Sequence, residues 1–584
     1  MPARLVVGVC LILAIWAGMW IRATAWRMTP TVRFGPDLNS AYHWGTRARE
    51  WGGVLRVYDE ERARNPGQKL LDYPPLRLLI VTQWAERVRR THPNFDVRGW
   101  SRNVVKPLLR VNLTAELATA VGIFLLVRTW LGRAPGFLRE APATSASSVG
   151  LRRASSSGLD RATEWAALAP PTSRALASAL LFWFNPAVIL VGHVFPQWDV
   201  WLLPAFVFGV LLATFGWWFW AGVLIAVGAM LKGQMLLVAP LFLLWPLFSR
   251  QWGAPLRWLA GFAGAGAVIA APWLVGSPGG VLWVGALILG LGVARGWRAR
   301  RSSGGAAVGA LLLLLAVALG PWLLTPGRAG LSLGLLFAGA LVVAAWLVPR
   351  GWTRYLAAYA LAGALGISGV AFGGSFGWFH MGFRNQATRD YVFFSDVGNP
   401  GSILHHVFSW PADTPLLGPL LSGSGMGAPF GRPLTLGHLF VLAYVAGLVL
   451  CAWATSRHAR GRDPRFLLAI AMPWVLLFAL LPNIRTRYLV WGAGLTAVGP
   501  ALGWGATLLH VVVTASASDN VLRTLLPRAV PPFAPGLRAA LEAVHPHGGW
   551  VVLACSVALL WIVLRPAPRV APGVGNSAGE TARS

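Results

Sequence analysis

The chain of 584 residues is 56% hydrophobic and only 12% charged, with a mean hydropathy of +0.58. This composition excludes an ordinary soluble protein and indicates a polytopic membrane protein. The net charge is +30, but its basic residues are scattered between apolar runs, so we expect no nucleic acid partner. The positive charge instead indicates orientation in a lipid bilayer and contact with it.

Apolar runs near 20 residues long recur along the chain, and this length crosses a bilayer as a helix. We therefore predict an all-α fold, a polytopic transmembrane helix bundle of about 14 spans. The predicted spans lie near 5–22, 108–128, 175–193, 198–214, 216–231, 234–248, 256–275, 281–294, 305–324, 329–348, 353–372, 434–454, 465–481, 488–508 and 549–564.

Short arginine-rich loops predict the orientation, because such loops remain in the cytoplasm. Placing the N-terminus inside also places the basic segments 129–174, 294–301, 349–354 and 456–465 inside. The predicted organisation is a first transmembrane helix (1–22), an extracytoplasmic loop (23–107), a transmembrane bundle (108–372) with a cytoplasmic linker (129–174), a second extracytoplasmic loop (373–433), C-terminal transmembrane helices (434–564) and a disordered tail (565–584).

The first loop contains the stretch "QKLLDYPPLRLLI" at 68–80. Pro74 and Pro75 favour an extended entry followed by the first turn of a helix. The next residues, 76–90, have the pattern of an amphipathic helix at the membrane interface. We therefore expect the large first loop to carry interfacial helices.

Asp37 precedes His43 and Trp44 in the same loop. Its carboxylate could accept a proton from a hydroxyl group, or it could cap a short helix that starts near Leu38. The sequence leaves both interpretations open, and the same choice applies to Asp72.

Further polar stretches fall at the extracytoplasmic ends of predicted spans, where ionisable groups are costly and usually functional. They are "GHVFPQWD" (192–199), "MLKGQM" (230–235), "WFHMGFRNQ" (378–386) and "LPNIRTRY" (481–488). Lys232, Arg485 and Arg487 suit an anion, although long basic side chains also extend to the interface without binding one. Asp199 is interpreted as a possible cap of the fourth span, and His193 as either a site residue or a locally bonded loop histidine. No Walker loop, zinc-ligand spacing or GxSxG motif is present, so the sequence gives no support for a nucleotide-driven pump or a hydrolase.

The first loop resembles membrane glycosyltransferases of the GT-C class, most closely the dolichyl-phosphate-glucose-dependent glucosyltransferases and their bacterial relatives. In that family an Asp after the first helix precedes a His-Trp pair, and "DYPPL" ends the loop, in the order seen here at Asp37, His43-Trp44 and 72–76. "FNPAVILVGHVFPQWD" (184–199), "LKGQ" (231–234) and "LPNIRTRYLVW" (481–491) resemble later elements. The last usually reads Met-His-Glu-Arg-Tyr, so Arg485-Thr486 departs from it, and 275–370 shows no match.

The resemblance implies an inverting transfer of a hexose from a polyprenyl-phosphate sugar to an extracytoplasmic glycan, lipid or protein acceptor. It implies Asp37 as the general base, with no cofactor and no required metal, in a bacterial inner membrane whose extracytoplasmic face carries the active site. The substrate-binding residues that it implies are His43, Trp44, Asp72, Tyr73, His193, Gln197, Lys232, Gln234, His380, Arg384, Arg485, Arg487 and Tyr488.

Trp44, Tyr73, Trp198 and Trp378 are expected to stack on sugar rings. The alternatives are a transporter or flippase of a polyprenyl-linked or anionic lipid, which would not need Asp37, and a membrane scaffold with degenerate catalytic residues.

Overall fold

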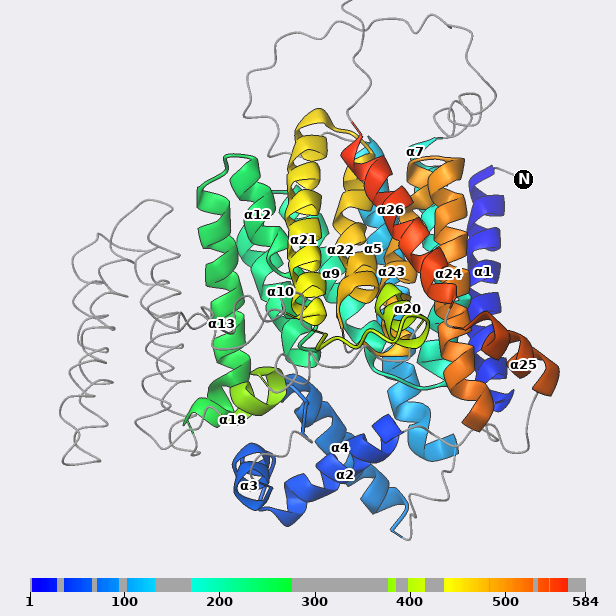
Figure 1. Ribbon diagram of the computed structural model, residues 1–584. Coiled ribbons are helices and arrows are strands. Elements are labelled where there is room, and N and C mark those ends of the chain that lie inside the picture. The colour runs from blue at the N-terminus through cyan, green and yellow to red at the C-terminus, as the bar shows by residue number, and fades with distance from the viewer. Residues whose placement is uncertain are drawn as a thin grey trace, which may run out of the picture.

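The computed structural model describes residues 3–28, 36–65, 71–93, 102–132, 170–275, 377–384, 398–414, 435–482, 484–528, 534–545 and 547–565. Within these ranges the regular elements are helices, which gather into one bundle with a smaller group of helices at one end (Figure 1). The predicted spans between 281 and 372 lie outside the described residues.

The first part of the chain builds the smaller group. Helix α1 (Ala3–Met28) runs along the side of the bundle, and α2 (Pro36–Glu50), α3 (Val57–Arg64) and α4 (Pro75–Thr91) lie beyond its far end (Figure 1). The predicted helix at 76–90 is therefore confirmed. Pro74 is extended at the N-cap of α4 and Pro75 occupies the first turn, as the two prolines predicted.

The bundle is built from longer helices and several short ones. Its first half contains α5 (Arg102–Gly132), α7 (Pro171–Trp183), α8 (Pro186–Ile189), η2 (Leu190–Val194), η3 (Asp199–Trp201), α9 (Leu202–Thr214), α10 (Trp218–Leu231), α11 (Met235–Val238), α12 (Leu241–Phe248) and α13 (Gly253–Val275). The second half contains α18 (Gly377–Phe379), η4 (His380–Arg384), α20 (Pro400–His406), α21 (Leu436–Gly461), α22 (Arg465–Leu480), η5 (Thr486–Tyr488), α23 (Leu489–Leu495), η6 (Thr496–Ala501), α24 (Trp504–Leu525), η7 (Leu526–Arg528), α25 (Pro535–Val544) and α26 (Gly548–Leu564).

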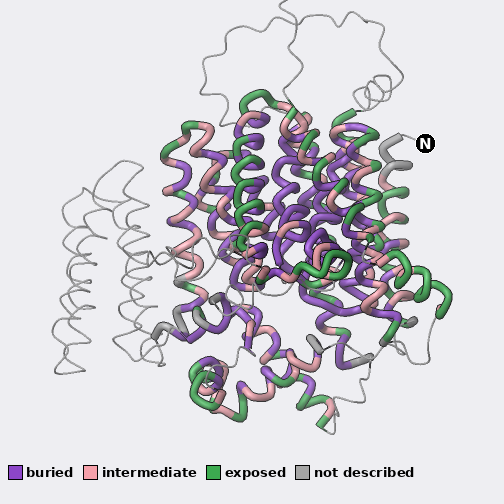
Figure 2. The backbone as a smooth tube through the Cα atoms, in the orientation of Figure 1, coloured by how far each residue is buried: buried purple, intermediate pink, exposed green. Residues whose placement is uncertain are grey.

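Among the described residues, four helices are long and apolar enough to cross a membrane: Gly8–Arg27, Val104–Gly132, Pro171–Val194 and Leu436–Gly461. The bent pair Pro535–Val544 and Gly548–Leu564 makes a fifth, and shorter apolar helices fill the space between them. Burial is greatest in the centre of the bundle, and many outward faces are exposed (Figure 2). Exposed outer side chains such as Ile12, Leu508 and Trp561 are apolar, as a bilayer environment requires.

The prediction of a single span at 488–508 is wrong. The chain there passes through η5, α23 and η6, and a separate helix, α24, follows at Trp504–Leu525. Gly503 between them has a φ of 139°, which disfavours any side chain. The polar residues of α24, such as His510 and Asn520, are buried against other helices, so its sequence lacks the uniform hydropathy of a lipid-facing span.

The C-terminal end of α26 is fastened to the end of α21. Arg457 donates hydrogen bonds from Nη2 to the carbonyl oxygens of Leu564 at 2.9 Å and Arg565 at 2.6 Å, and His458 Nε2 lies 2.7 Å from the oxygen of Val563. Basic groups satisfy the free carbonyls of a helix end and complement its dipole. This end of the bundle is also where α1 begins (Figure 1).

Candidate functional site

A buried carboxylate with two cationic partners lies at the end of the bundle nearest the first-loop helices. Asp199 is fully buried at the start of η3, and its side chain accepts a hydrogen bond from Lys232 Nζ, which follows the end of α10. Arg487 Nε lies 2.8 Å from the second oxygen of Asp199. We call Asp199, Lys232 and Arg487 the charged cluster.

The aromatic residues of the 488–491 turn cover the charged cluster. The ring of Tyr488 stacks on that of Trp491 at 4.5 Å between centroids, and Lys232 Nζ lies 4.6 Å from the Tyr488 ring centre. Gln234 Nε2 donates to the Tyr488 hydroxyl at 3.2 Å, and Trp491 Nε1 donates to the backbone oxygen of Asp199 at 2.7 Å. Four of the predicted site residues, Lys232, Gln234, Arg487 and Tyr488, are thus brought together.

Two cations of the charged cluster, Lys232 and Arg487, contact the same carboxylate. Asp199 does not cap the fourth span, as one interpretation of the sequence held: the N-cap of α9 is Trp201, which forms no side-chain cap bond. Its carboxylate instead contacts Lys232 and Arg487. Arg485 stays outside the cluster, because its side chain is exposed.

An apolar pocket of about 340 Å³ lies between α9 and α10, and all eight side chains that line it are apolar. Trp201 and Leu231 are among them, two residues after Asp199 and one residue before Lys232. The lining on α9 extends from there to Leu212, a distance of about 16 Å at the rise of an α-helix. The pocket therefore runs along α9 and α10, and two of its lining residues, Trp201 and Leu231, are close in sequence to members of the charged cluster.

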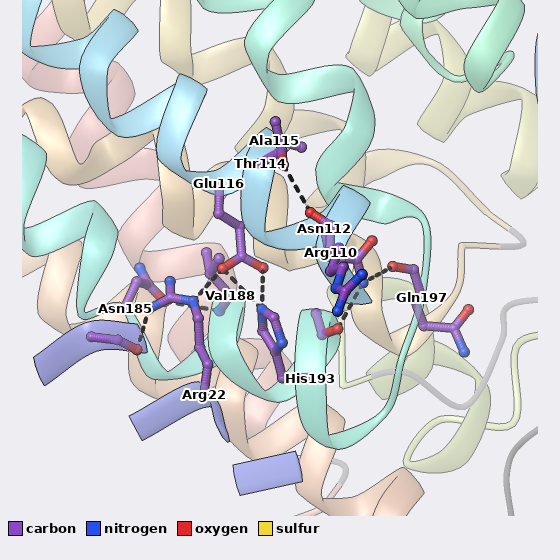
Figure 3. A network of polar contacts seen from close by, with 12 residues as sticks. Arg22, Arg110, Asn112, Thr114, Ala115, Glu116, Asn185, Val188, His193 and Gln197 are labelled. Atoms are coloured by element: carbon purple, nitrogen blue, oxygen red, sulfur yellow. Dashed lines mark hydrogen bonds and ion pairs between the residues drawn. The ribbon is translucent and has the colours of Figure 1, made fainter. Parts of the chain in front are cut away.

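A second polar network lies deeper among α1, α5 and η2 (Figure 3). Arg22 Nε donates to Glu116 Oε2 at 2.5 Å, and its two terminal nitrogens donate to the oxygens of Gly18 and Trp183. His193 Nε2 lies 3.2 Å from Glu116 Oε1. All three side chains are buried, so Glu116 neutralises Arg22 and fixes His193 between helices.

Two asparagines shape the chain around this network. Asn185 is the N-cap of α8, which begins at Pro186. Its Oδ1 accepts hydrogen bonds from the N–H groups of Ala187 and Val188. Asn112 Nδ2 donates to the oxygens of Gly192 at 2.7 Å and Gln197 at 3.1 Å. These bonds hold the π-helical turn η2 and the segment that follows it. Gln197 contributes its backbone carbonyl to this contact, while its side chain points away (Figure 3).

The first-loop residues lie on α2 and before α4. Helix α2 begins at Pro36, so Asp37 lies in its first turn rather than preceding a helix that starts near Leu38. His43 and Trp44 follow on the same helix with their rings 5.2 Å apart. Burial, and next the positive charge of Arg47, lower the pKa of His43 below its ordinary value.

The segment before α4 is tightly packed. The hydroxyl of Tyr58 donates to the backbone oxygen of Tyr73 at 2.6 Å, and Asp72 is half-buried just before it. A side chain at Gly382, in η4, would come within 3.1 Å of Tyr73 O and Pro74 Cα, so η4 rests directly on this segment. The backbones of His380 and Arg384 therefore lie beside it, while their side chains are outside the described part.

The four aromatic residues expected to stack on sugars are buried in this structure: Trp44, Tyr73, Trp198 and Trp378 are each at most 9% exposed. Their rings pack against protein, as Trp198 does against Trp201 at 5.2 Å. In the part of the chain that the structure describes, no three His, Cys, Asp or Glu side chains gather as metal ligands.

Sequence reasoning did not identify Glu116, Arg22, Asn112 or the role of Asp199. The sequence did contain a signal for Glu116 and Arg22, because burying a charged side chain in an apolar helix costs free energy unless it pairs with an opposite charge. No protein-family model and no curated protein matches the chain.

Proposed function

We propose that the protein is a membrane glycosyltransferase that moves a hexose from a polyprenyl-phosphate sugar to an acceptor hydroxyl. The observation that carries this proposal is the charged cluster, in which two cations contact one carboxylate, close in sequence to residues that line an apolar pocket. A polyprenyl-phosphate sugar has the matching parts, because an anionic phosphate links a long apolar chain to a sugar.

The first-loop helices supply the second half of the site. The guanidinium carbon of Arg77 on α4 lies 5.9 Å from the ring of Trp198, so the loop contacts the residue that precedes Asp199. Asp37 lies on α2, which packs on α4 through Gly45, whose missing side chain lets Ala85 approach. We propose that the carboxylate of Asp37 serves an acceptor that arrives from outside the bundle.

In the proposed reaction, Asp37 accepts the proton of the acceptor hydroxyl while that oxygen attacks the anomeric carbon. The bond between this carbon and the phosphate oxygen breaks on the opposite face, which inverts the configuration. The leaving polyprenyl phosphate gains a negative charge, and the cations Lys232 and Arg487 stabilise it. The ring of Tyr488 lies against both cations, and Gln234 holds Tyr488 through its hydroxyl.

The test measures sugar transfer by the purified protein from synthetic polyprenyl-phosphate hexoses to a mixture of lipid and glycan acceptors. We compare the wild type with Asp37→Asn, which keeps the shape but removes the base, and with the matched control Asp413→Asn. Asp413 is an exposed aspartate elsewhere in the chain. We expect Asp37→Asn to lower the rate by about 10²- to 10⁴-fold while the control remains active.

Transfer that survives in Asp37→Asn would move the base to another residue, with Asp72 next in line. Movement of the lipid phosphate across vesicles without any transfer would favour the flippase alternative, because that activity needs the pocket and the cations but not Asp37. Vesicle transport is therefore measured alongside transfer, with the same three proteins.

A further inference from the structure

We infer that Arg77 and Trp198 form the binding site for a phosphoryl group at the N-terminus of α4. Arg77 is only 5% exposed, and its guanidinium carbon lies 3.8 Å from the centre of the Tyr73 ring. In the described structure no carboxylate forms an ion pair with it, and its buried Nε has no hydrogen-bond acceptor. A buried cation without an anion is costly, which indicates that an anionic ligand completes the site.

Trp198 adds a second donor. Its indole is 2% exposed, and Nε1 is buried with no acceptor. The guanidinium carbon of Arg77 lies 5.9 Å from the Trp198 ring, so two donors that lack acceptors come from neighbouring side chains. Two such donors point to a ligand with several acceptor oxygens.

The N-terminus of α4 provides a third contribution. No side chain caps it, and its first turn contains no acidic residue, although the helix is 17 residues long. Arg77 belongs to that first turn, and its guanidinium folds back over Tyr73, which precedes the helix. The helix dipole and the arginine therefore favour negative charge at the same place.

A phosphate ester suits these groups better than a carboxylate. It offers three oxygens, while the planar guanidinium binds two of them and the indole N–H can reach another. The inference deepens the proposed function, and rests on it for the lipid source of the phosphate. Lys232 and Arg487 already contact the carboxylate of Asp199. Arg77 and Trp198 would therefore be the residues that contact the phosphate oxygens.

The test measures ligand binding without turnover, so it can succeed even if sugar transfer fails. The probes are geranyl phosphate, inorganic phosphate and uncharged geraniol, each titrated into the full chain in detergent micelles. The proteins are the wild type, Arg77→Met, and Arg87→Met, which removes an exposed arginine from the same helix. Calorimetry gives the affinity, and the thermal unfolding midpoint gives the stabilisation by ligand.

We expect geranyl phosphate to raise the unfolding midpoint of the wild type and of Arg87→Met alike. Arg77→Met should bind it about 10- to 100-fold more weakly and lose the midpoint shift. Without ligand, Arg77→Met should unfold at the same temperature as the wild type or higher, because it removes an unpaired buried charge. Binding by geranyl phosphate alone indicates a lipid head group, and equal binding of inorganic phosphate indicates a free phosphate; both support the site.

Three results would overturn the inference. The first is a midpoint shift of wild-type size in Arg77→Met. The second is a lower midpoint of Arg77→Met with an intact affinity, which would make Arg77 a packing residue against Tyr73. The third is stabilisation by geraniol equal to that by geranyl phosphate, which would show that only the apolar chain is recognised.

Discussion

Replacing Asp199 with asparagine tests the charge balance of the buried cluster. At 2.8 Å and an effective dielectric constant of about 20, the attraction between Arg487 and Asp199 is worth about 6 kcal/mol before desolvation is subtracted. Asp199→Asn leaves the buried Lys232 and the partly buried Arg487 without this carboxylate, so we expect a loss of about 3–5 kcal/mol in the free energy of unfolding. The backbone bond from Trp491 remains, because it uses the main-chain oxygen of Asp199.

Lys232→Met should cost less, no more than about 2 kcal/mol, because it leaves a neutral Asp199–Arg487 pair. The double variant should then be more stable than Asp199→Asn alone, which a double-mutant cycle measures directly. Denaturant unfolding in mixed micelles, followed by tryptophan fluorescence, provides the free energies, and Asp413→Asn serves as the exposed control. The reasoning fails if Asp199→Asn is as stable as the control, or if Lys232→Met is the more damaging of the two.

Three further predictions concern the deep network and the first loop. Glu116→Gln should lower the free energy of unfolding by about 3 kcal/mol, measured as above, because a buried arginine loses its carboxylate; an unchanged value would mean that the ion pair contributes nothing net. Gly192→Ala should cost about 1–3 kcal/mol, because its Cβ collides with Glu116 Oε1, whereas Gly8→Ala has open space and should be near neutral; equal effects would contradict the packing. The pKa of His43 is lowered in the folded state, so below about pH 6.5 the folded state binds fewer protons than the unfolded state, and stability falls as the pH is lowered. Thermal scans should show a smaller loss for His43→Gln, and an identical loss in that variant would show that other groups cause it.

The elements that sequence predicted well have local causes. The start of α4 follows from Pro74 and Pro75, whose restricted backbone permits an extended entry and a first helical turn. Helix α26 is likewise predicted from its apolar sequence alone, without knowledge of the helices that it packs against. Helix α24 was missed because its polar residues are accommodated by other helices, which hydropathy along the chain cannot detect.

The candidate site shows the same division. The sequence predicted that Lys232 and Arg487 lie at span ends on one face, and the structure brings both to Asp199. The role of Asp199 depends on which side chains face it across the bundle, and the sequence does not show this. An aspartate near the start of a helix is equally consistent with a helix cap. The pairing of Arg22 with Glu116, 94 residues apart, is also set by packing alone.

The anchoring of α26 to α21 has a practical consequence for experiments on topology. Helix α26 ends at the end of the bundle where α1 begins, and the first-loop helices lie at the opposite end (Figure 1). Reporter enzymes fused before α1 or after α26 should therefore signal the same compartment. A purification tag at either position should also leave the face with the charged cluster and α4 unobstructed for substrate assays.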